Sequence, residues 1–176
     1  MIDAVSKRRS ERSYAPKEVE KEKLEEIIWS GLFAPTSANR RPVHYIIVKD
    51  AETKKNLAKA TKWGGFIADA PAAIVVCAEM AMDRGKRWVE DCSIAATHLM
   101  LEIEAQGLGG CWVQVREGDR EDKNDAEQIV RDVLKIPKEY RVLCMLSLGY
   151  PKKKLPSHKK DEFQREFKER IHLEKF

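Results

Sequence analysis

Arginine is the side chain best suited to hold a phosphate, because its planar guanidinium is always charged and offers paired donors. Arg8, Arg9 and Arg12 lie close together near the start of the chain, with Ser10 between them. Lys159 and Lys160 form a second basic cluster in the tail. The two clusters could converge on one anion, or each could be a solvated face. Charge alone favours the solvated faces.

A second candidate region is the loop from 34 to 42. Pro35 and Pro42 stiffen it, while Thr36, Ser37 and Asn39 supply short hydroxyl and amide groups. This mix suits the edge of a heterocycle that is held without a formal charge. The alternative is that the same residues cap a turn between a helix and a strand.

Three glycines in the segment Gly107-Leu108-Gly109-Gly110-Cys111-Trp112 mark a junction between a helix and a strand. Their spacing is not that of a dinucleotide-binding fingerprint, which opens a helix instead of preceding a strand. We expect these glycines to let the backbone come close to a flat ligand or to a neighbouring chain.

Other catalytic groups find little support. The histidines show no metal-ligand spacing, so no metal site is expected, and His98 is expected to be a hydrogen-bonded interior residue. Neither Ser10 nor Ser37 sits in a nucleophile elbow, and there is no Walker-type phosphate loop.

Composition points to one soluble domain of 176 residues, 43% hydrophobic and 35% charged. The net charge is +4, and residues 150–176 hold nine Lys or Arg against five Asp or Glu, so the tail carries the excess. An excess of this size does not indicate a nucleic-acid-binding protein. The four cysteines lie unpaired among apolar neighbours, as small buried hydrophobes do in a reducing compartment. We expect a cytoplasmic protein, because no signal-peptide core or membrane-spanning run is present.

Hydrophobic periodicity predicts alternating helices and strands. Helices are expected over 2–7, 20–33, 51–60, 87–106, 124–134 and 163–170, and strands over 43–49, 72–78, 108–115 and 141–148. Asn124 is expected to cap the fifth helix and Gly107 to end the fourth in a left-handed conformation. This order indicates a single α+β or three-layer α/β domain. The helix over 87–106 is apolar around most of its circumference, so we expect it to be buried on all sides and to form a dimer contact.

In chain order, these segments resemble the nitroreductase family, and in particular its short prokaryotic members. The matching motifs are Arg8-Arg9-Ser10-x-Arg12-x-Tyr14, Ala34-Pro35-Thr36-Ser37-x-Asn39-x-x-Pro42, Asp91 to Leu101 with Gly107 to Trp112, Ile136-Pro137, Leu148-Gly149-Tyr150-Pro151, and Ile171 to Phe176. Each motif is weak by itself, and the ordered set is specific.

The resemblance implies an α+β fold over residues 1–176 with a central, mostly antiparallel sheet flanked by helices in three layers. It further implies an intertwined homodimer, in which a tail from about 151 to 176 packs on the partner. The implied cofactor is FMN, with NADH or NADPH as electron donor. Electrons pass to nitroaromatics, quinones or related small acceptors in a ping-pong scheme. No protein side chain need be catalytic, because the flavin carries the chemistry.

The resemblance also implies roles for the residues of the first motif. Arg8 matches a position that binds the FMN phosphate, assisted from the tail by Lys159 or Lys160. Arg9 and Ser10 match positions that contact the cofactor. Arg12 matches a basic position near the N1/C2=O edge of the ring, where a cation would stabilise the negative charge of the reduced flavin.

Three further segments take their roles from the same resemblance. The loop residues Pro35, Thr36, Ser37 and Asn39 match a loop that reaches the flavin of the partner subunit. Gly64 and Gly65 fall where a segment touching the pyrimidine edge is expected. Trp112, Val113 and Gln114 match the strand that lines the ring near N5.

Three departures from the family pattern bear on the substrate. Arg40-Arg41 replaces the usual Gln of the second motif, Val113-Gln114 stands where a Gly is common, and the polar stretch from 116 to 125 is longer than in the shortest members. A flavin-binding redox sensor or carrier and a specialised, dehalogenase-like flavin enzyme therefore remain alternatives. A basic nucleic-acid-binding module is a distant third, because Trp88 and Trp112 sit among apolar neighbours.

Overall fold

The computed structural model describes residues 1–83, 86–117 and 126–176. Its helices are α1 (Asp3–Lys7), α2 (Lys21–Leu32), α3 (Ala51–Ala58), α4 (Trp88–Ala105), α5 (Ala126–Leu134) and α6 (Gln164–Glu169). Its strands are β1 (Val43–Val48), β2 (Ala72–Glu79), β3 (Gly109–Gln114) and β4 (Tyr140–Gly149), and short 3-10 turns span Ser37–Asn39, Gly65–Ile67 and Lys160–Phe163. Every predicted element that lies in the described residues is found. The predicted cap Asn124 lies outside them.

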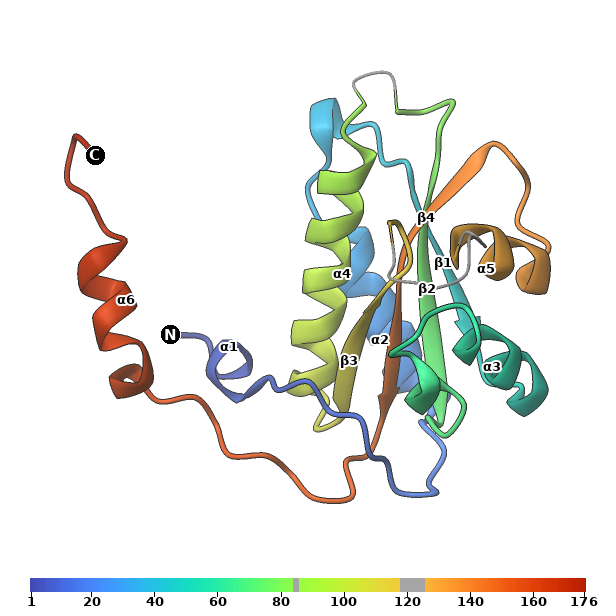
Figure 1. Ribbon diagram of the computed structural model, residues 1–176, viewed down its shortest axis with the longest axis horizontal. Coiled ribbons are helices and arrows are strands. Elements are labelled where there is room, and N and C mark those ends of the chain that lie inside the picture. The colour runs from blue at the N-terminus through green and yellow to red at the C-terminus, as the bar shows by residue number, and fades with distance from the viewer. Residues whose placement is uncertain (84–85, 118–125) are drawn as a thin grey trace.

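The strands form one sheet in the order β1-β2-β4-β3, and every neighbouring pair is antiparallel. Alternate residues of β2 feed two cores, because successive side chains of a strand point to opposite faces. Ile74 and Val76 pack with α2 and α4, whereas Val75 and Cys77 pack with α3 and α5. Figure 1 shows the resulting three layers. The predicted fold class is confirmed.

One chain does not cover α4 on all sides, so the expected burial of the whole helix depends on the expected dimer contact, which stays a prediction. Nine residues of α4 are buried, but Glu90, Ile94 and Thr97 are exposed on its outer side. The sheet, α2 and α1 cover α4 from several directions, and the side that carries Glu90, Ile94 and Thr97 is left uncovered. The outer side is therefore available to another molecule.

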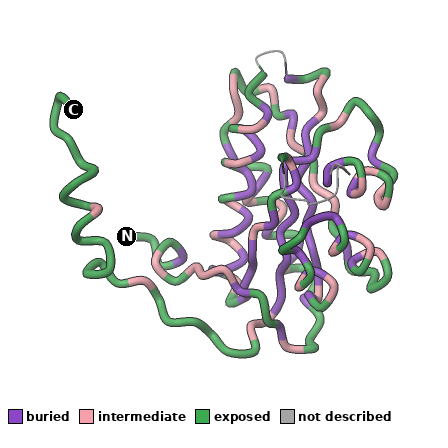
Figure 2. Tube along the Cα trace, in the orientation of Figure 1, coloured by how far each residue is buried: buried purple, intermediate pink, exposed green. Residues whose placement is uncertain are grey.

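Both ends of the chain leave the three-layer body. Figure 1 shows α1 and α6 beside it, and Figure 2 shows that the segment after β4 is exposed along nearly its whole length. The tail carries large apolar side chains in this exposed position, with Phe167 at 67% and Leu173 at 88% exposure. Exposed apolar surface of this kind marks an interaction site.

Several local predictions are confirmed. All four cysteines are free and buried, as expected of small hydrophobes. Gly107 has φ +76°, the left-handed conformation predicted for the end of α4. His98 is half-buried, and its Nδ1 lies 3.1 Å from the carbonyl oxygen of Ser30, so this histidine has a local hydrogen-bond partner.

The end of β4 packs tightly against two rigid groups. A Cβ on Gly149 would collide with the ring of Pro71 and would lie 3.2 Å from Cδ1 of Tyr14. Gly149 and Tyr14 are both buried, and a proline ring cannot rotate away. Glycine is thus required at this position by packing.

Replacing Gly149 by Ala should lower the free energy of unfolding by about 1–3 kcal/mol, because overpacking a filled core forces neighbouring atoms apart. Urea unfolding followed by circular dichroism would measure the change. Gly65→Ala is the matched control, since a Cβ there meets nothing within 4 Å. The packing explanation fails if the two variants have the same stability.

Candidate functional site

The N-terminal cations are placed by backbone bonds to the sheet. Ser10 forms a parallel bridge with Gly110 of β3, and the N–H of Glu11 donates to the Gly110 carbonyl at 3.0 Å. The hydroxyl of Tyr14 donates to the carbonyl of Glu11 at 2.5 Å and lies 2.7 Å from Ser147 Oγ. Residues 10–14 are therefore fixed against the free edge of β3.

Gly109 and Gly110, at the start of β3, leave room for close packing because they have no side chain. A Cβ on Gly109 would lie 2.5 Å from Cγ of Glu11, and one on Gly110 would lie 3.0 Å from the carbonyl oxygen of Ser147. We expected the glycines to admit a flat ligand or another chain. The expectation is wrong at these positions, because the close neighbours are the chain's own N-terminal segment and β4.

A cleft of about 190 Å³ lies beside β3, and we call it the β3 cleft. It is lined by Arg12, Thr61, Trp63, Phe66, Trp112, Val113, Gln114 and Glu117. The Arg12 guanidinium carbon lies 5.7 Å from the centre of the Phe66 ring, and Arg12 Nη1 donates to the Ser10 carbonyl at 3.1 Å. The cleft thus has one fixed cation beside an aromatic face.

The backbone of β3 adds polar groups to this cleft. β3 is an edge strand, and the carbonyl of Gly110 points away from β4, toward Glu11. Groups of alternate residues point the same way along a strand, so Trp112 and Gln114 also turn their N–H and C=O groups to the free edge. The Trp112 indole N–H donates to Gln114 Oε1 at 2.9 Å, and Gln114 Nε2 donates to the Arg116 carbonyl at 2.7 Å.

The floor of the β3 cleft contains an unpaired hydroxyl. Thr61 is 9% exposed, and its Oγ1 has no hydrogen-bond partner in the described part of the chain. A Cβ on Gly64 would lie 2.5 Å from this oxygen and 3.2 Å from Cγ1 of Val113, so Gly64 is required by packing. Gly65 faces open space. A buried polar atom without a partner indicates that a ligand group completes the site.

The positive charges of the first motif act together on β3. Burial raises the pKa of the Cys111 thiol, while the charges of Arg12 and Arg8 and a hydrogen bond from Ser10 oppose this rise. Cys111 is therefore held as a thiol and is no nucleophile at neutral pH.

The tail runs antiparallel to the N-terminal segment, and we call this pairing the strap. The N–H of Lys152 donates to the Ser13 carbonyl at 3.0 Å, and the N–H of His158 donates to the Ser6 carbonyl at 2.8 Å. Between these two bonds, Arg9 Nη1 donates to the Pro156 carbonyl at 2.6 Å. The strap therefore brings the two basic ends of the chain together.

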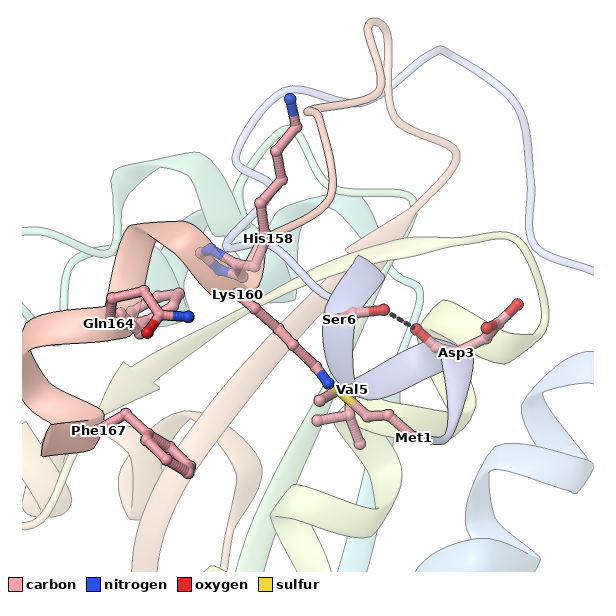
Figure 3. A pocket seen from close by; sticks show the side chains of 10 residues that line it. Met1, Asp3, Val5, Ser6, His158, Lys160, Gln164 and Phe167 are labelled. Atoms are coloured by element: carbon pink, nitrogen blue, oxygen red, sulfur yellow. Dashed lines mark hydrogen bonds between the residues drawn. The ribbon is translucent and has the colours of Figure 1, made fainter. Parts of the chain in front are cut away.

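A larger cleft of about 900 Å³ lies between α1 and the tail. Its lining residues are Met1, Asp3, Val5, Ser6, His158, Lys159, Lys160, Phe163, Gln164 and Phe167. Figure 3 shows Lys160 reaching across it toward α1, where Ser6 Oγ donates to the Asp3 carbonyl at 3.0 Å. The cleft is lined by both apolar and basic side chains, and the Lys160 side chain ends beside Val5 and Met1 (Figure 3).

The loop 34–42 lies elsewhere. The N–H of Ser37 donates to Asp91 Oδ1 at 2.8 Å, which ties the loop to the first turn of α4. Glu104, near the last turn of α4, pairs instead with Lys154 of the tail at 3.0 Å. The 18 residues of α4 span about 27 Å, so the loop and the strap are at opposite ends of this helix.

The loop builds its own cleft of about 450 Å³, lined in part by Pro35, Thr36, Asn39 and Arg41. Thr36 Oγ1 accepts from the N–H of Arg41 at 3.0 Å, and Asn39 Oδ1 accepts from Arg41 Nε at 3.0 Å. Asn39 and Arg41 have positive φ values of 54° and 52°. Arg41, a departure from the family pattern, thus holds the loop in shape.

The predicted site residues therefore fall into three groups in the described chain. Arg12 and Trp112 to Gln114 share the β3 cleft, next to Gly64, with Ser10 bonded alongside. Arg9 joins the tail that carries Lys159 and Lys160. The loop residues Pro35 to Asn39 stand apart. The sequence analysis missed Thr61, Phe66 and the buried Glu11, because none of them belongs to a motif with a known chemical signature.

The model of the nitroreductase family matches residues 5–87 and 61–150. The chain belongs to the nitroreductase family. No helix in the described part of this family member is long and apolar enough to cross a membrane. No group of three His, Cys, Asp or Glu residues among those described is arranged to hold a metal ion.

Three relatives cover most of this nitroreductase-family chain. A protein of Archaeoglobus fulgidus, named as an NADH dehydrogenase/NAD(P)H nitroreductase, is 35% identical over 171 residues, which are 96% of this chain and 94% of that protein. An NADPH-flavin oxidoreductase of Vibrio harveyi is 27% identical over an alignment of 176 positions, which covers 89% of this chain and 70% of that protein. The solved structure of an FMN-dependent nitroreductase from Clostridium difficile R20291 is 37% identical, with a TM-score of 0.93 and full coverage of both chains.

Proposed function

We propose that this protein is an FMN-dependent oxidoreductase that takes electrons from NADH or NADPH and passes them to a small acceptor. The observation that carries the proposal is that the N-terminal arginine segment is bonded both to the free edge of β3, through Ser10 and Glu11, and to the basic tail, through the strap. The names of its relatives support the same activity: an FMN-dependent nitroreductase, an NAD(P)H nitroreductase and an NADPH-flavin oxidoreductase.

The residues beside β3 fit FMN. Arg8 and one of Lys159 or Lys160 would hold the phosphate, since these cations stand on two segments that the strap holds together. The outward N–H and C=O groups of Trp112 and Gln114 suit the heteroatoms of a flat ring. The unpaired Thr61 hydroxyl leaves one hydrogen bond for a ligand to supply. When bound, FMN would supply the electron-transfer chemistry between a nicotinamide and an acceptor.

We assign to Arg12 the role of stabilising the negative charge of the reduced cofactor. Arg12 is exposed to the β3 cleft and its guanidinium is held by the Ser10 carbonyl and the Phe66 face. A cation placed in advance stabilises developing negative charge without paying for reorganisation. The other residues of the site would bind the cofactor, orient the electron donor or acceptor against it and exclude water.

A second copy of the chain would complete the site. The β3 cleft, at about 190 Å³, is smaller than the roughly 300 Å³ at which ligand pockets begin, so one chain supplies only part of the enclosure. We assign the rest to the loop residues Pro35, Thr36, Ser37 and Asn39 of a partner. The uncovered side of α4 and the exposed apolar tail from 151 to 176 supply surface for such a homodimer.

We assign the finer properties by family membership. The acceptors would be nitroaromatics, quinones or related small molecules, reduced in a ping-pong scheme in which donor and acceptor use one site in turn. Four free, buried cysteines suit a reducing, cytoplasmic setting.

The protein should bind FMN and turn it over. Incubation with FMN and desalting should leave a flavin absorbance band with the protein, and anaerobic NADH or NADPH should bleach it. A quinone should restore the band, and initial rates at several quinone concentrations should give parallel double-reciprocal lines. A colourless protein would refute the proposal, and a flavoprotein that neither nicotinamide bleaches would be a carrier.

Arg8 and Arg12 should differ in what they control. Arg8→Ala should weaken FMN binding by roughly 10- to 100-fold, because it removes a charge-assisted hydrogen bond. Arg12→Ala should lower the two-electron reduction potential of bound FMN by about 30–60 mV, the equivalent of one such bond, with less effect on affinity. Fluorescence titration and a dye-equilibration potential for each variant would test the assignment. Identical behaviour of the two variants would contradict it.

The tail should hold the dimer together. In analytical ultracentrifugation the protein should sediment as two chains of 20.2 kDa each. Phe167→Glu places a charge on an apolar tail residue that is 67% exposed in one chain, and it should shift the protein toward the monomer at micromolar concentration. Lys168→Glu, on the same short helix, is the charge control and should remain dimeric. A wild-type monomer would overturn the assembly.

A further inference from the structure

A buried carboxylate occupies the middle of the strap. Glu11 is 7% exposed, although it stands between Arg9 and Arg12 in a strongly basic segment. Its Oε1 accepts a hydrogen bond from the backbone N–H of Leu155 in the tail at 3.2 Å. Burying a carboxylate is costly unless it is hydrogen-bonded, so this contact is the reason that the burial is tolerated.

The surroundings of Glu11 are shaped to hold it. Its side chain lies where a Cβ on Gly109 would otherwise stand, with Glu11 Cγ 2.5 Å from that position. Its backbone N–H bonds to Gly110, and its backbone carbonyl accepts from Tyr14. The main chain of Glu11 therefore bonds to β3, whereas its carboxylate bonds to the tail.

The position of Leu155 makes this contact matter for the basic cluster. Leu155 precedes Lys159 by four residues, which span at most about 14 Å of extended chain. Fixing the Leu155 backbone therefore limits where Lys159 and Lys160 can lie. The neighbouring ion pair of Lys154 with the buried Glu104 holds the same stretch from the α4 side.

We propose that Glu11 is a positioning residue for the phosphate end of the cofactor site, acting through the Leu155 backbone to keep the tail that carries Lys159 and Lys160 against the N-terminal arginine segment. The inference rests on the proposed function, because the ligand that these cations would share is the FMN phosphate. Glu11 need not touch the cofactor. Loss of the Glu11 carboxylate should weaken the binding of the phosphate by the tail lysines. It should leave the binding of the flavin ring beside β3 unchanged.

Comparing FMN with riboflavin separates these two parts, because riboflavin has the ring and lacks the phosphate. Glu11→Ala should weaken FMN binding by about tenfold, the scale of leaving one partly buried N–H without a partner, and change riboflavin binding by less than about twofold. Glu11→Gln keeps the size and an oxygen acceptor, and should restore most of the FMN affinity. Fluorescence titration gives both constants for each variant.

Two further measurements keep the proposal testable. Leu155→Pro removes the backbone N–H that donates to Glu11, and it does so at an exposed residue. If Glu11→Ala does not fold, Leu155→Pro should show the same selective loss of FMN binding. Glu25→Ala removes an exposed carboxylate of α2 and should change neither ligand. Hydrogen exchange should show a faster Leu155 amide in Glu11→Ala than in Glu11→Gln.

The outcomes distinguish this inference from the proposed function. A wild-type protein that binds neither FMN nor riboflavin refutes the proposed function itself. A wild type that binds FMN, together with a Glu11→Ala variant whose two affinities fall in parallel or stay unchanged, overturns the role of Glu11 alone. A selective loss for FMN that Glu11→Gln rescues establishes it.

Discussion

The pairing of residues 10–14 with the end of the sheet is the constraint on which the candidate site depends. One bridge between Ser10 and Gly110 attaches the N-terminal segment to β3, and one between Tyr14 and Pro151 attaches it to the second residue after β4. The tail then has a surface to run along, and it leaves the sheet beside the arginines. Without this attachment the two basic clusters would be independent solvated arms, as their charges taken alone suggested.

The attachment works against electrostatic repulsion. The strap holds the segment that carries Arg8, Arg9 and Arg12 against the segment that carries Lys159 and Lys160, and like charges held close together destabilise a fold. Two backbone hydrogen bonds of the strap are indifferent to side-chain charge, and the buried Glu11 accepts a further bond from the tail within this basic segment. A stable fold that tolerates concentrated positive charge is what an anion-binding site requires.

The sequence was informative where the physical signal is local. The continuous apolar run of β2, the long apolar segment that forms α4 and the left-handed Gly107 depend on neighbouring residues, and all three elements appear where they were predicted. Contacts between residues far apart in the sequence could not be predicted in this way. A glutamate between arginines looks like a solvated charge, and only the fold shows that Leu155, 144 positions away, makes its burial favourable. For the same reason Gly109 was read as space for a ligand, when it is space for Glu11.

The separation of the loop 34–42 from the strap is the feature that the proposed homodimer explains. A single chain cannot bring the ends of α4 together, because the helix is rigid and about 27 Å long. Two copies related by a two-fold axis along the uncovered side of α4 could place the loop of one copy against the β3 cleft of the other, and both sites would form at once. In that arrangement the exposed side of α4, the small volume of the β3 cleft and the unpaired apolar tail have one common cause. In the proposed dimer, each would be surface that one chain leaves for the other.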